Sequence, residues 1–340
     1  MKVIKQQNIS FSDFKSELSV RWCPGCGDHA ILNSVQRAMA ELGLRTNEVA
    51  VISGIGCSSR FTYYMSTYGF HTIHGRASAI ASGVKTLNPN LSVWQITGDG
   101  DALAIGGNHF IHAIRRNVDI NLILFNNQIY GLTKGQYSPT SSHGAVSATS
   151  PHGTVEHPFR PGELTIGARG NFFARTIDKD VKLSTSVFIE SAKHKGTSVV
   201  EVLQNCVIFN DNIHAAITDR EHRADRTILL EHGKPMLFGK EGNKGLILDG
   251  GDLKVVTVGE KGIIESDILV HDAESVDNSL HLKLITMEYP DFPVALGVVR
   301  SVKAMVYDQE VTKQIKNVQS KSKIKTFRDL AVEGDVWEVK

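Results

Sequence analysis

The pattern of apolar and polar residues over the first two thirds of the chain predicts strands connected by helices. A helix is predicted after Asp28, a suitable N-cap, because apolar residues recur at intervals of three and four until Gly43 ends the run. Buried strands are predicted where the chain stays apolar without a break, at residues 48–53, 91–97, 120–125 and 198–203.

Helical periodicity also lies between these apolar runs, at residues 101–116 and 181–195. A strand, a helix and a strand within about thirty residues imply a right-handed parallel βαβ unit, so we predict an α/β fold built on a parallel sheet. Ligands bind at the carboxyl ends of the strands in such sheets. The loops that follow three of the strands contain Cys57, Asp99 and Asn127, and we expect them to converge on one crevice.

The same pattern divides the chain into three parts. Residues 1–20 have few apolar positions and are predicted to form an N-terminal arm, whereas residues 21–215 carry the α/β pattern. Within them, residues 135–170 are dense in Ser, Thr, Pro, His and Gly, as expected of a long functional loop. Residues 216–340 are predicted to be a C-terminal extension, for which the pattern indicates no architecture.

Composition narrows the classes of protein to consider. The chain has 340 residues, of which 41% are hydrophobic and 21% charged, as in ordinary globular proteins. A formal net charge of +1 offers no broad basic field for nucleic acid, so we expect no nucleic-acid partner. No apolar run reaches the roughly 20 residues of a membrane span and the N-terminus lacks a signal-peptide core, so we expect a cytoplasmic protein with no membrane contact.

The strongest pair of motifs is Gly98-Asp99-Gly100-Asp101 and Asn126-Asn127, which begins 25 residues after Asp101. Together they resemble the thiamine pyrophosphate motif. Alone, the first would be read as a tight turn and the second as a helix cap. The diphosphate of this cofactor is held through a hard cation such as Mg²⁺, which prefers oxygen ligands.

In this motif each residue type has a chemical task. Asp99 supplies an anionic oxygen and Asn127 a neutral one, and by the pattern of the motif the third ligand is the backbone carbonyl of Ile129. The glycines at positions 98 and 100 let the backbone approach the phosphates, and the helix that begins near Asp101 points its N-terminal amides at the anion.

The chain has four cysteines: Cys23, Cys26, Cys57 and Cys206. Four are too few for a disulfide scaffold, and a reducing compartment would keep them as thiols. A redox-active dithiol would use only the first pair, whereas a structural zinc ion or a 4Fe-4S cluster would use all four. The second CxxC of a zinc ribbon is missing, which weighs against zinc and leaves the choice open. Buried, inert cysteine is a further interpretation, for Cys206 alone.

Four longer motifs make a resemblance specific. They are Trp22-Cys23-Pro24-Gly25-Cys26-Gly27, Gly54-Ile55-Gly56-Cys57-Ser58, His74-Gly75-Arg76-Ala77 and Tyr130-Gly131-Leu132-Thr133-Lys134-Gly135-Gln136. Over about residues 15–215 the chain resembles the thiamine pyrophosphate-binding β subunits of 2-oxoacid:ferredoxin oxidoreductases, in which these motifs occur in the same order.

The resemblance implies site residues. It implies that all four cysteines carry one 4Fe-4S cluster close to the thiamine pyrophosphate. It implies cofactor contacts from Cys57, Ser58, His74, Gly98, Asp99, Gly100, Asp101, Asn127, Ile129, Gly131 and Leu132. Catalytic or substrate-side roles are implied for His74 near the diphosphate, Lys134 near substrate or coenzyme A, and Arg60. Each of these three would otherwise be read as a solvated or structural charge, and Leu132 as core.

The resemblance also implies a reaction and partners. The family oxidises 2-oxoacids with coenzyme A and passes the electrons through the cluster to ferredoxin, or runs the reverse, CO₂-fixing reaction. We assign no activating Glu in this chain, and in the family that residue belongs to a separate α subunit. We therefore expect the chain to be inactive alone and to work in a heterodimer or a dimer of heterodimers.

The substrate expectation rests on two segments. Residues 130–136 and 231–236 resemble the 2-oxoglutarate branch, which makes succinyl-CoA, whereas pyruvate or a broad range of 2-oxoacids is the alternative. A non-redox thiamine-dependent decarboxylase half-site with structural cysteines is a second alternative. A third is an electron-carrying or structural metal protein in which residues 98–100 are only a turn.

Overall fold

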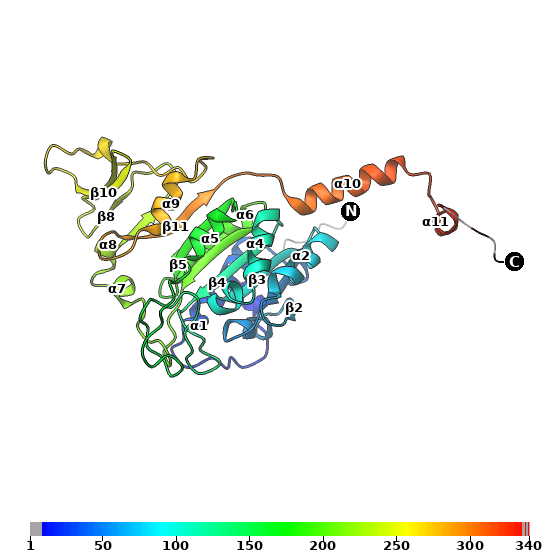
Figure 1. Cartoon of the computed structure of the whole chain (residues 1–340), viewed down its shortest axis with the longest axis horizontal. Coiled ribbons are helices and arrows are strands. Elements are labelled where there is room, and N and C mark those ends of the chain that lie inside the picture. Colours follow the sequence, from blue (N-terminus) through cyan, green and yellow to red (C-terminus); the bar gives the residue numbers. More distant parts are fainter. Residues whose placement is uncertain (1–8, 335–336, 338, 340) are drawn as a thin grey trace.

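In the computed structural model, residues 9–334, 337 and 339 are described. The first eight residues of the expected N-terminal arm lie outside this range. The described part of the arm lies against the body: a short 3₁₀ helix spans Phe11–Phe14, and the side chain of Phe14 is buried in the core. Figure 1 shows one large sheet with helices on both faces and a long C-terminal projection.

The central sheet has eight strands in the order β2-β1-β3-β4-β6-β5-β11-β7. All neighbouring strands are parallel except β11 and β5. This confirms the predicted α/β fold with a mostly parallel sheet. The bounds are β1 (Val49–Ser53), β2 (Tyr68–His71), β3 (Ser92–Gly98), β4 (Asn121–Asn126), β5 (Phe172–Ile177), β6 (Ser198–Leu203), β7 (Thr227–Leu230) and β11 (Val294–Ser301).

Helices cover both faces of the sheet because its strands are apolar on both sides. Along β4, Ile123 and Phe125 pack in the cluster that contains α1 and α6, whereas Leu122 and Leu124 pack in the cluster that contains α4, α5 and α9. The helix α2 lies beside α4. Their bounds are α1 (Asp28–Glu41), α2 (Ala77–Leu87), α4 (Gly107–Arg116), α5 (Pro161–Gly167), α6 (Val181–Lys193) and α9 (Ser279–Thr286).

The single helix predicted for residues 101–116 is wrong. The chain forms α3 (Asp99–Leu103) and α4 (Gly107–Arg116), with a break between them. The break lets two backbone segments touch, because a Cβ atom on Gly75 would lie 2.5 Å from the amide nitrogen of Gly106. The backbone N–H of Gly75 also donates to the carboxylate of Asp101 in α3 at 2.8 Å. The segment around Gly75 is therefore joined to the segment that follows β3, at the carboxyl edge of the sheet.

Residues beyond 215 complete the main sheet with β7 and β11 and add a small three-stranded sheet. This second sheet consists of β8 (Leu237–Phe238), β9 (Lys244–Asp249) and β10 (Asp252–Thr257). Short helices α7 (Ala215–Thr218) and α8 (Arg223–Arg226) lead into β7 of the main sheet. The boundary at residue 215 between a core domain and a C-terminal extension stays a prediction.

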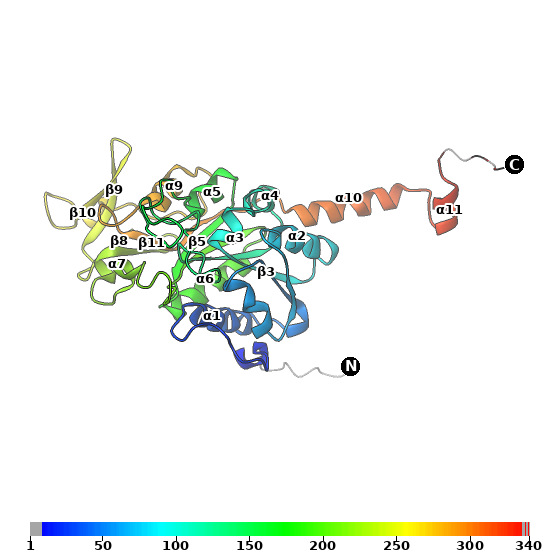
Figure 2. The same cartoon turned by 60° about the horizontal axis from the view of Figure 1, so that its bottom comes forward.

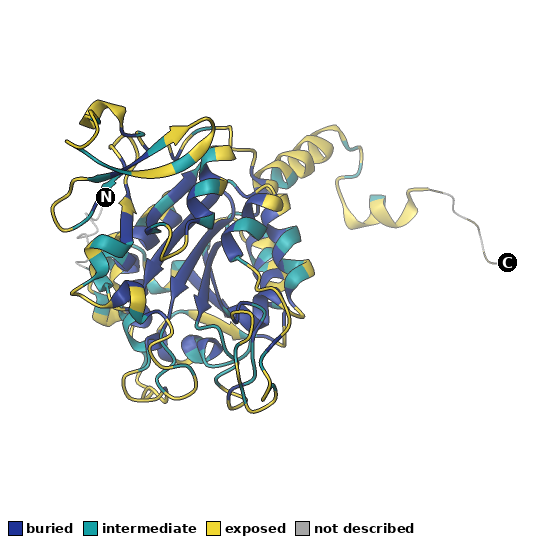
Figure 3. Ribbon diagram, turned by 60° about the vertical axis from the view of Figure 1, so that its left-hand side comes forward, coloured by how far each residue is buried: buried dark blue, intermediate teal, exposed yellow. Residues whose placement is uncertain are grey.

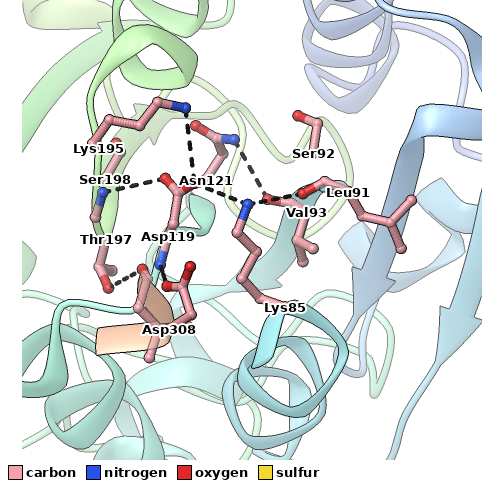
Figure 4. Close-up of polar contacts among 12 residues, drawn as sticks. Lys85, Leu91, Ser92, Val93, Asp119, Asn121, Lys195, Thr197, Ser198 and Asp308 are labelled. Carbon is pink, nitrogen blue, oxygen red and sulfur yellow. Dashed lines mark hydrogen bonds and ion pairs between the residues drawn. The ribbon is translucent and has the colours of Figure 1, made fainter. Parts of the chain in front are cut away.

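The chain then continues into two helices, α10 (Tyr307–Lys321) and α11 (Phe327–Val332), that project away from the body (Figure 2). Figure 3 shows that this projection is exposed, in contrast to the buried central strands. At its root, Asp308 is buried and accepts a hydrogen bond from the backbone N–H of Asp119 at 2.9 Å (Figure 4). Among the described residues, none of the helices has both the length and the apolar character needed to cross a bilayer.

Candidate functional site

A cavity of about 430 Å³ opens at the carboxyl ends of β1, β3 and β4. Because these strands are parallel, the loops after them meet at this edge, as the order of the motifs predicts. The cavity wall contains every residue predicted to contact thiamine pyrophosphate: Cys57, Ser58, His74, Gly98, Asp99, Gly100, Asp101, Asn127, Ile129, Gly131 and Leu132. The individual roles of these residues stay predictions.

Asp99 begins α3 at the floor of the cavity and is only 2% exposed. The hydroxyl of Ser138 lies 2.6 Å from its Oδ2 atom, and the hydroxyl of Thr140 donates to the same oxygen. Burial raises the pKa of Asp99, and the two hydroxyls oppose that rise. A buried carboxylate facing a cavity suits an anionic metal ligand, since a bound dication would favour its ionised form.

The loop after β4 is held by hydrogen bonds around Asn127. Its side-chain oxygen accepts a hydrogen bond from the backbone N–H of Ile129 at 3.1 Å, and its carbonyl accepts one from the Asn210 side chain at 2.9 Å. Gln128 adopts a left-handed backbone conformation with φ 56°, which turns the chain tightly between the two predicted ligands. The oxygen donors predicted for Mg²⁺ thus border one cavity on two adjacent strands.

Asp101 has a different task from its neighbour. Its carboxylate accepts hydrogen bonds from the Gly75 N–H at 2.8 Å and from the Thr97 hydroxyl at 3.0 Å. Burial raises its pKa, and these hydrogen bonds oppose the rise. Although Asp101 lines the cavity, its carboxylate also fastens the loop of His74 to the end of β3.

Gly100 and Tyr130 are matched in shape. A Cβ atom on Gly100 would lie 2.2 Å from the ring of Tyr130, so no other residue fits there without a shift. The Tyr130 hydroxyl donates to the carbonyl of Gly100 at 3.1 Å, and burial raises the pKa of Tyr130 to about 12. This pair joins the Asp99 loop to the loop that carries Gly131.

One of the four cysteines, Cys57, lines the same cavity, and the sulfur of Cys206 lies beside it, next to Gly131. The sulfurs of Cys206 and Cys57 would lie 3.4 Å and 3.6 Å from a Cβ atom on Gly131, so a glycine there leaves room between them. The sulfur of Cys26 lies 3.3 Å from the Gln204 amide nitrogen, and its backbone N–H donates to Cys23 at 3.1 Å.

Two of these thiols are perturbed by their surroundings. Burial, with Asp28 and the other cysteines, raises the pKa of Cys57 to about 12, and burial likewise raises the pKa of Cys26. Thiols in such an environment ionise only when a metal takes the proton's place. Within the described residues, no three His, Cys, Asp or Glu side chains lie close enough together to share a single metal ion.

The three candidate catalytic residues are placed differently. His74 lines the cavity and is exposed. Lys134 is exposed on the neighbouring loop with φ 77°, outside the cavity wall. Arg60 donates to the Tyr64 hydroxyl at 3.1 Å, and its charge lowers the pKa of Cys57 against the dominant effect of burial. Arg60 therefore acts on Cys57 by its charge and is not itself part of the cavity wall.

Several residues of the site belong to no motif that could be recognised in the sequence. Ser138 and Thr140 come from the Ser- and Thr-rich loop predicted to be functional, without being singled out in it. Asp28, expected as an N-cap, is the first residue of α1, and Gly27 is the cap. The carboxylate of Asp28 is buried at the cavity wall, and burial raises the pKa of Asp28 to about 7.

Comparisons with known proteins agree with this geometry. Residues 54–202 match the family described as thiamine pyrophosphate enzyme, C-terminal TPP binding domain. The chain is 47% identical over 304 residues to the KorB subunit of 2-oxoglutarate oxidoreductase from Mycobacterium tuberculosis, covering 89% of this chain and 81% of the relative. It is 45% identical over 185 residues to the KorB subunit of 2-oxoglutarate synthase from Archaeoglobus fulgidus, covering 54% and 69%.

A solved structure shows the same fold over nearly the whole chain. It is the 2-oxoglutarate:ferredoxin oxidoreductase from Magnetococcus marinus with 2-oxoglutarate, coenzyme A and succinyl-CoA bound, at 31% identity and a TM-score of 0.77. The match covers 98% of each chain, including the region beyond residue 215. The resemblance seen in the motifs is thereby confirmed: the chain belongs to the β subunits of the 2-oxoacid:ferredoxin oxidoreductases, a family of oxidoreductases, beside the 2-oxoglutarate enzymes.

Proposed function

We propose that this chain is the subunit that binds thiamine pyrophosphate and a 4Fe-4S cluster in a cytoplasmic 2-oxoglutarate:ferredoxin oxidoreductase. With an α subunit and coenzyme A it would convert 2-oxoglutarate to succinyl-CoA and CO₂, passing two electrons to ferredoxin, or run the reverse reaction. The observation that carries this proposal is the meeting of the Asp99, Asn127 and Cys57 loops around one cavity, with the sulfur of Cys206 next to Gly131 in its wall.

On the diphosphate side, the chain offers a defined set of oxygens. Asp99 and Asn127, with the carbonyl of Ile129, would hold Mg²⁺, and Gly98 and Gly100 let the backbone approach the phosphates. The short helix α3 begins at Asp99, so its first amides face the same cavity. Thiamine pyrophosphate, when bound, supplies the electron sink for the pair released as CO₂ leaves.

On the redox side, Cys23, Cys26, Cys57 and Cys206 would hold the cluster. Gly131 lines the cavity beside the sulfurs of Cys57 and Cys206, so these two residues would hold the cluster next to the cofactor cavity. The thiols must lose their protons to bind iron, and the energy of the iron bonds would offset the burial that raises the pKa of Cys57.

The remaining chemistry is assigned to exposed groups and to a partner. His74, at the cavity wall, would meet an anionic ligand, and exposed Lys134 would meet coenzyme A or the substrate carboxylate. The activating Glu would come from the α subunit in a heterodimer or a dimer of heterodimers. The high identity to 2-oxoglutarate enzymes supports this substrate over pyruvate.

The direct test is an anaerobic assay of the chain co-expressed with its α subunit. We expect ferredoxin reduction that requires both 2-oxoglutarate and coenzyme A, a lower rate with pyruvate, and no activity from this chain alone. The Asp99→Ala variant of the same complex is the matched control and should be inactive. Decarboxylation without ferredoxin reduction, in a complex that retains thiamine pyrophosphate, would favour the non-redox alternative.

A further inference from the structure

A chain of buried polar side chains runs behind the cavity from β5 to the Asp99 loop. Arg175 and Glu201 are directly opposed on β5 and β6, and the Arg175 Nε atom lies 2.7 Å from the Glu201 carboxylate. These side chains are 6% and 2% exposed as residues, so the ion pair is taken out of water.

Glu201 also determines how Asn126 is oriented. The second carboxylate oxygen of Glu201 accepts from the Asn126 amide nitrogen at 2.7 Å. Because a carboxylate only accepts hydrogen bonds, the amide must turn its nitrogen to Glu201 and its oxygen the other way. That oxygen lies 3.0 Å from the hydroxyl of Thr140. The backbone carbonyl of Asn126 is held as well, by the His214 ring at 2.9 Å.

Thr140 connects this chain to the site. Its hydroxyl lies between the Asn126 oxygen and the Oδ2 atom of Asp99, and its single proton serves one of the two at a time. Ser138 contacts the same Asp99 oxygen, at 2.6 Å. Within the described residues, the other carboxylate oxygen of Asp99 carries no side-chain hydrogen bond.

The network is not explained by packing. Asn126, Thr140, Arg175, Glu201 and His214 all line a second cavity of about 180 Å³ behind the first. Their positions are therefore set by hydrogen bonds on this side, where close packing is absent. A buried ion pair is seldom more stable than apolar side chains of the same volume, so its presence points to a role in orientation.

We propose that Glu201 and Thr140 are positioning residues for the metal that holds the diphosphate. Glu201, anchored by Arg175, turns the Asn126 oxygen toward Thr140; the single proton of Thr140 is shared between that oxygen and Asp99; and Thr140 with Ser138 holds one oxygen of Asp99, which leaves the other oxygen to the metal. This inference rests on the proposed function, because it takes Asp99 as a ligand of Mg²⁺. Residues of this kind, behind the ligands, typically change metal affinity 10-fold to 100-fold.

The test uses the complex with the α subunit and measures the apparent dissociation constant of Mg²⁺ at saturating thiamine pyrophosphate. The cofactor is followed by circular dichroism, and iron per chain is determined for each variant. We expect Thr140→Val and Glu201→Gln to weaken Mg²⁺ binding by about 10-fold to 100-fold with unchanged iron content. Thr140→Ser, which keeps the hydroxyl, should restore native affinity, and raised Mg²⁺ should restore cofactor binding to the other two.

The matched control is a second, largely buried ion pair away from the site. Lys85 and Asp119 lie 2.8 Å apart (Figure 4), beside the first residues of β3 and β4 and thus at the amino ends of these strands. Lys85→Met should lower thermal stability and leave Mg²⁺ affinity unchanged.

Three results would overturn the inference. The first is native Mg²⁺ affinity in both Thr140→Val and Glu201→Gln. The second is a loss of Mg²⁺ affinity in Lys85→Met as large as in these two variants, which would indicate general destabilisation. If Glu201→Gln does not fold, the Thr140→Val and Thr140→Ser pair decides alone. A native complex that binds no Mg²⁺ would overturn the proposed function, and this inference with it.

Discussion

The hydroxyl of Ser138 lies 2.6 Å from the carboxylate of Asp99, although 39 residues separate them in the chain. The contact brings the long Ser- and Thr-rich loop onto the predicted metal ligand, with the hydroxyl of Thr140 beside it. A buried carboxylate needs hydrogen-bond donors to stay ionised, and this loop supplies them. The loop therefore belongs to the proposed cofactor site.

Removing the carboxylate of Asp99 should abolish cofactor binding. In Asp99→Ala, Mg²⁺ loses its only predicted anionic protein ligand, so we expect thiamine pyrophosphate to be lost on gel filtration. Iron content should stay native because the cysteines are untouched, and it serves as the internal control for folding. Stoichiometric thiamine pyrophosphate in this variant would refute the assignment of Asp99.

Replacing one cysteine should remove the cluster and leave thiamine pyrophosphate bound. In Cys206→Ser or Cys57→Ser, the cluster loses a thiolate, so we expect loss of its absorption and of its electron paramagnetic resonance signal, with no ferredoxin reduction. Binding of thiamine pyrophosphate should persist, because the oxygen ligands remain. Normal electron transfer to ferredoxin in either variant would show that its cysteine is not a ligand.

Stability should depend on pH through His194. Burial lowers the pKa of this ring to about 4, and its Nε2 atom has no hydrogen-bond partner among the described residues. Because folding lowers the pKa of His194, protonating the ring opposes folding. The stabilising effect of keeping the ring neutral is fully present above pH 6.5 and is lost as the pH falls toward 4. Between pH 7.5 and pH 5 this amounts to about 2 kcal/mol.

Urea unfolding of the native chain and of His194→Leu, at both pH values, measures this effect. The variant should lose about 2 kcal/mol less than the native chain on acidification, because it has no ring to protonate. Equal losses in the two proteins would show that His194 is readily protonated in the folded state.

The part of the C-terminal projection beyond α10 should be dispensable for folding of the body. No residue of α11 is buried, so ending the chain after Lys321 should leave the melting temperature unchanged. Asp308→Ala, by contrast, removes the acceptor for the backbone N–H of Asp119 and should lower the free energy of unfolding by about 1 to 3 kcal/mol. A large drop in melting temperature on truncation would mean that α11 packs on the body in solution.

The sequence predicted the elements whose signals are local. Unbroken apolar runs gave the central strands, and the motif spacing placed Asp99 and Asn127 at one edge of the sheet, where the structure has them. The helix expected over residues 101–116 was wrong because a contact between Gly75 and Gly106, far apart in sequence, decides where it breaks.

Other features depend on contacts that no local pattern encodes. Ser138, Thr140 and Glu201 come from separate segments and meet Asp99 and Asn126 only in the folded chain. The strands β7 and β11 lie beyond the residues where the pattern is regular, and β11 runs antiparallel to β5, against the parallel pattern of the rest. Both escaped a prediction built on βαβ units.

The most direct measurement of the central claim is iron, acid-labile sulfide and zinc per chain in the anaerobically purified complex with the α subunit. After any clusters of the partner are subtracted, we predict about four irons and four sulfides per chain, with thiamine pyrophosphate bound. Zinc without sulfide, or no metal at all in protein protected from oxygen, would contradict the account and leave a thiamine-binding half-site with structural cysteines.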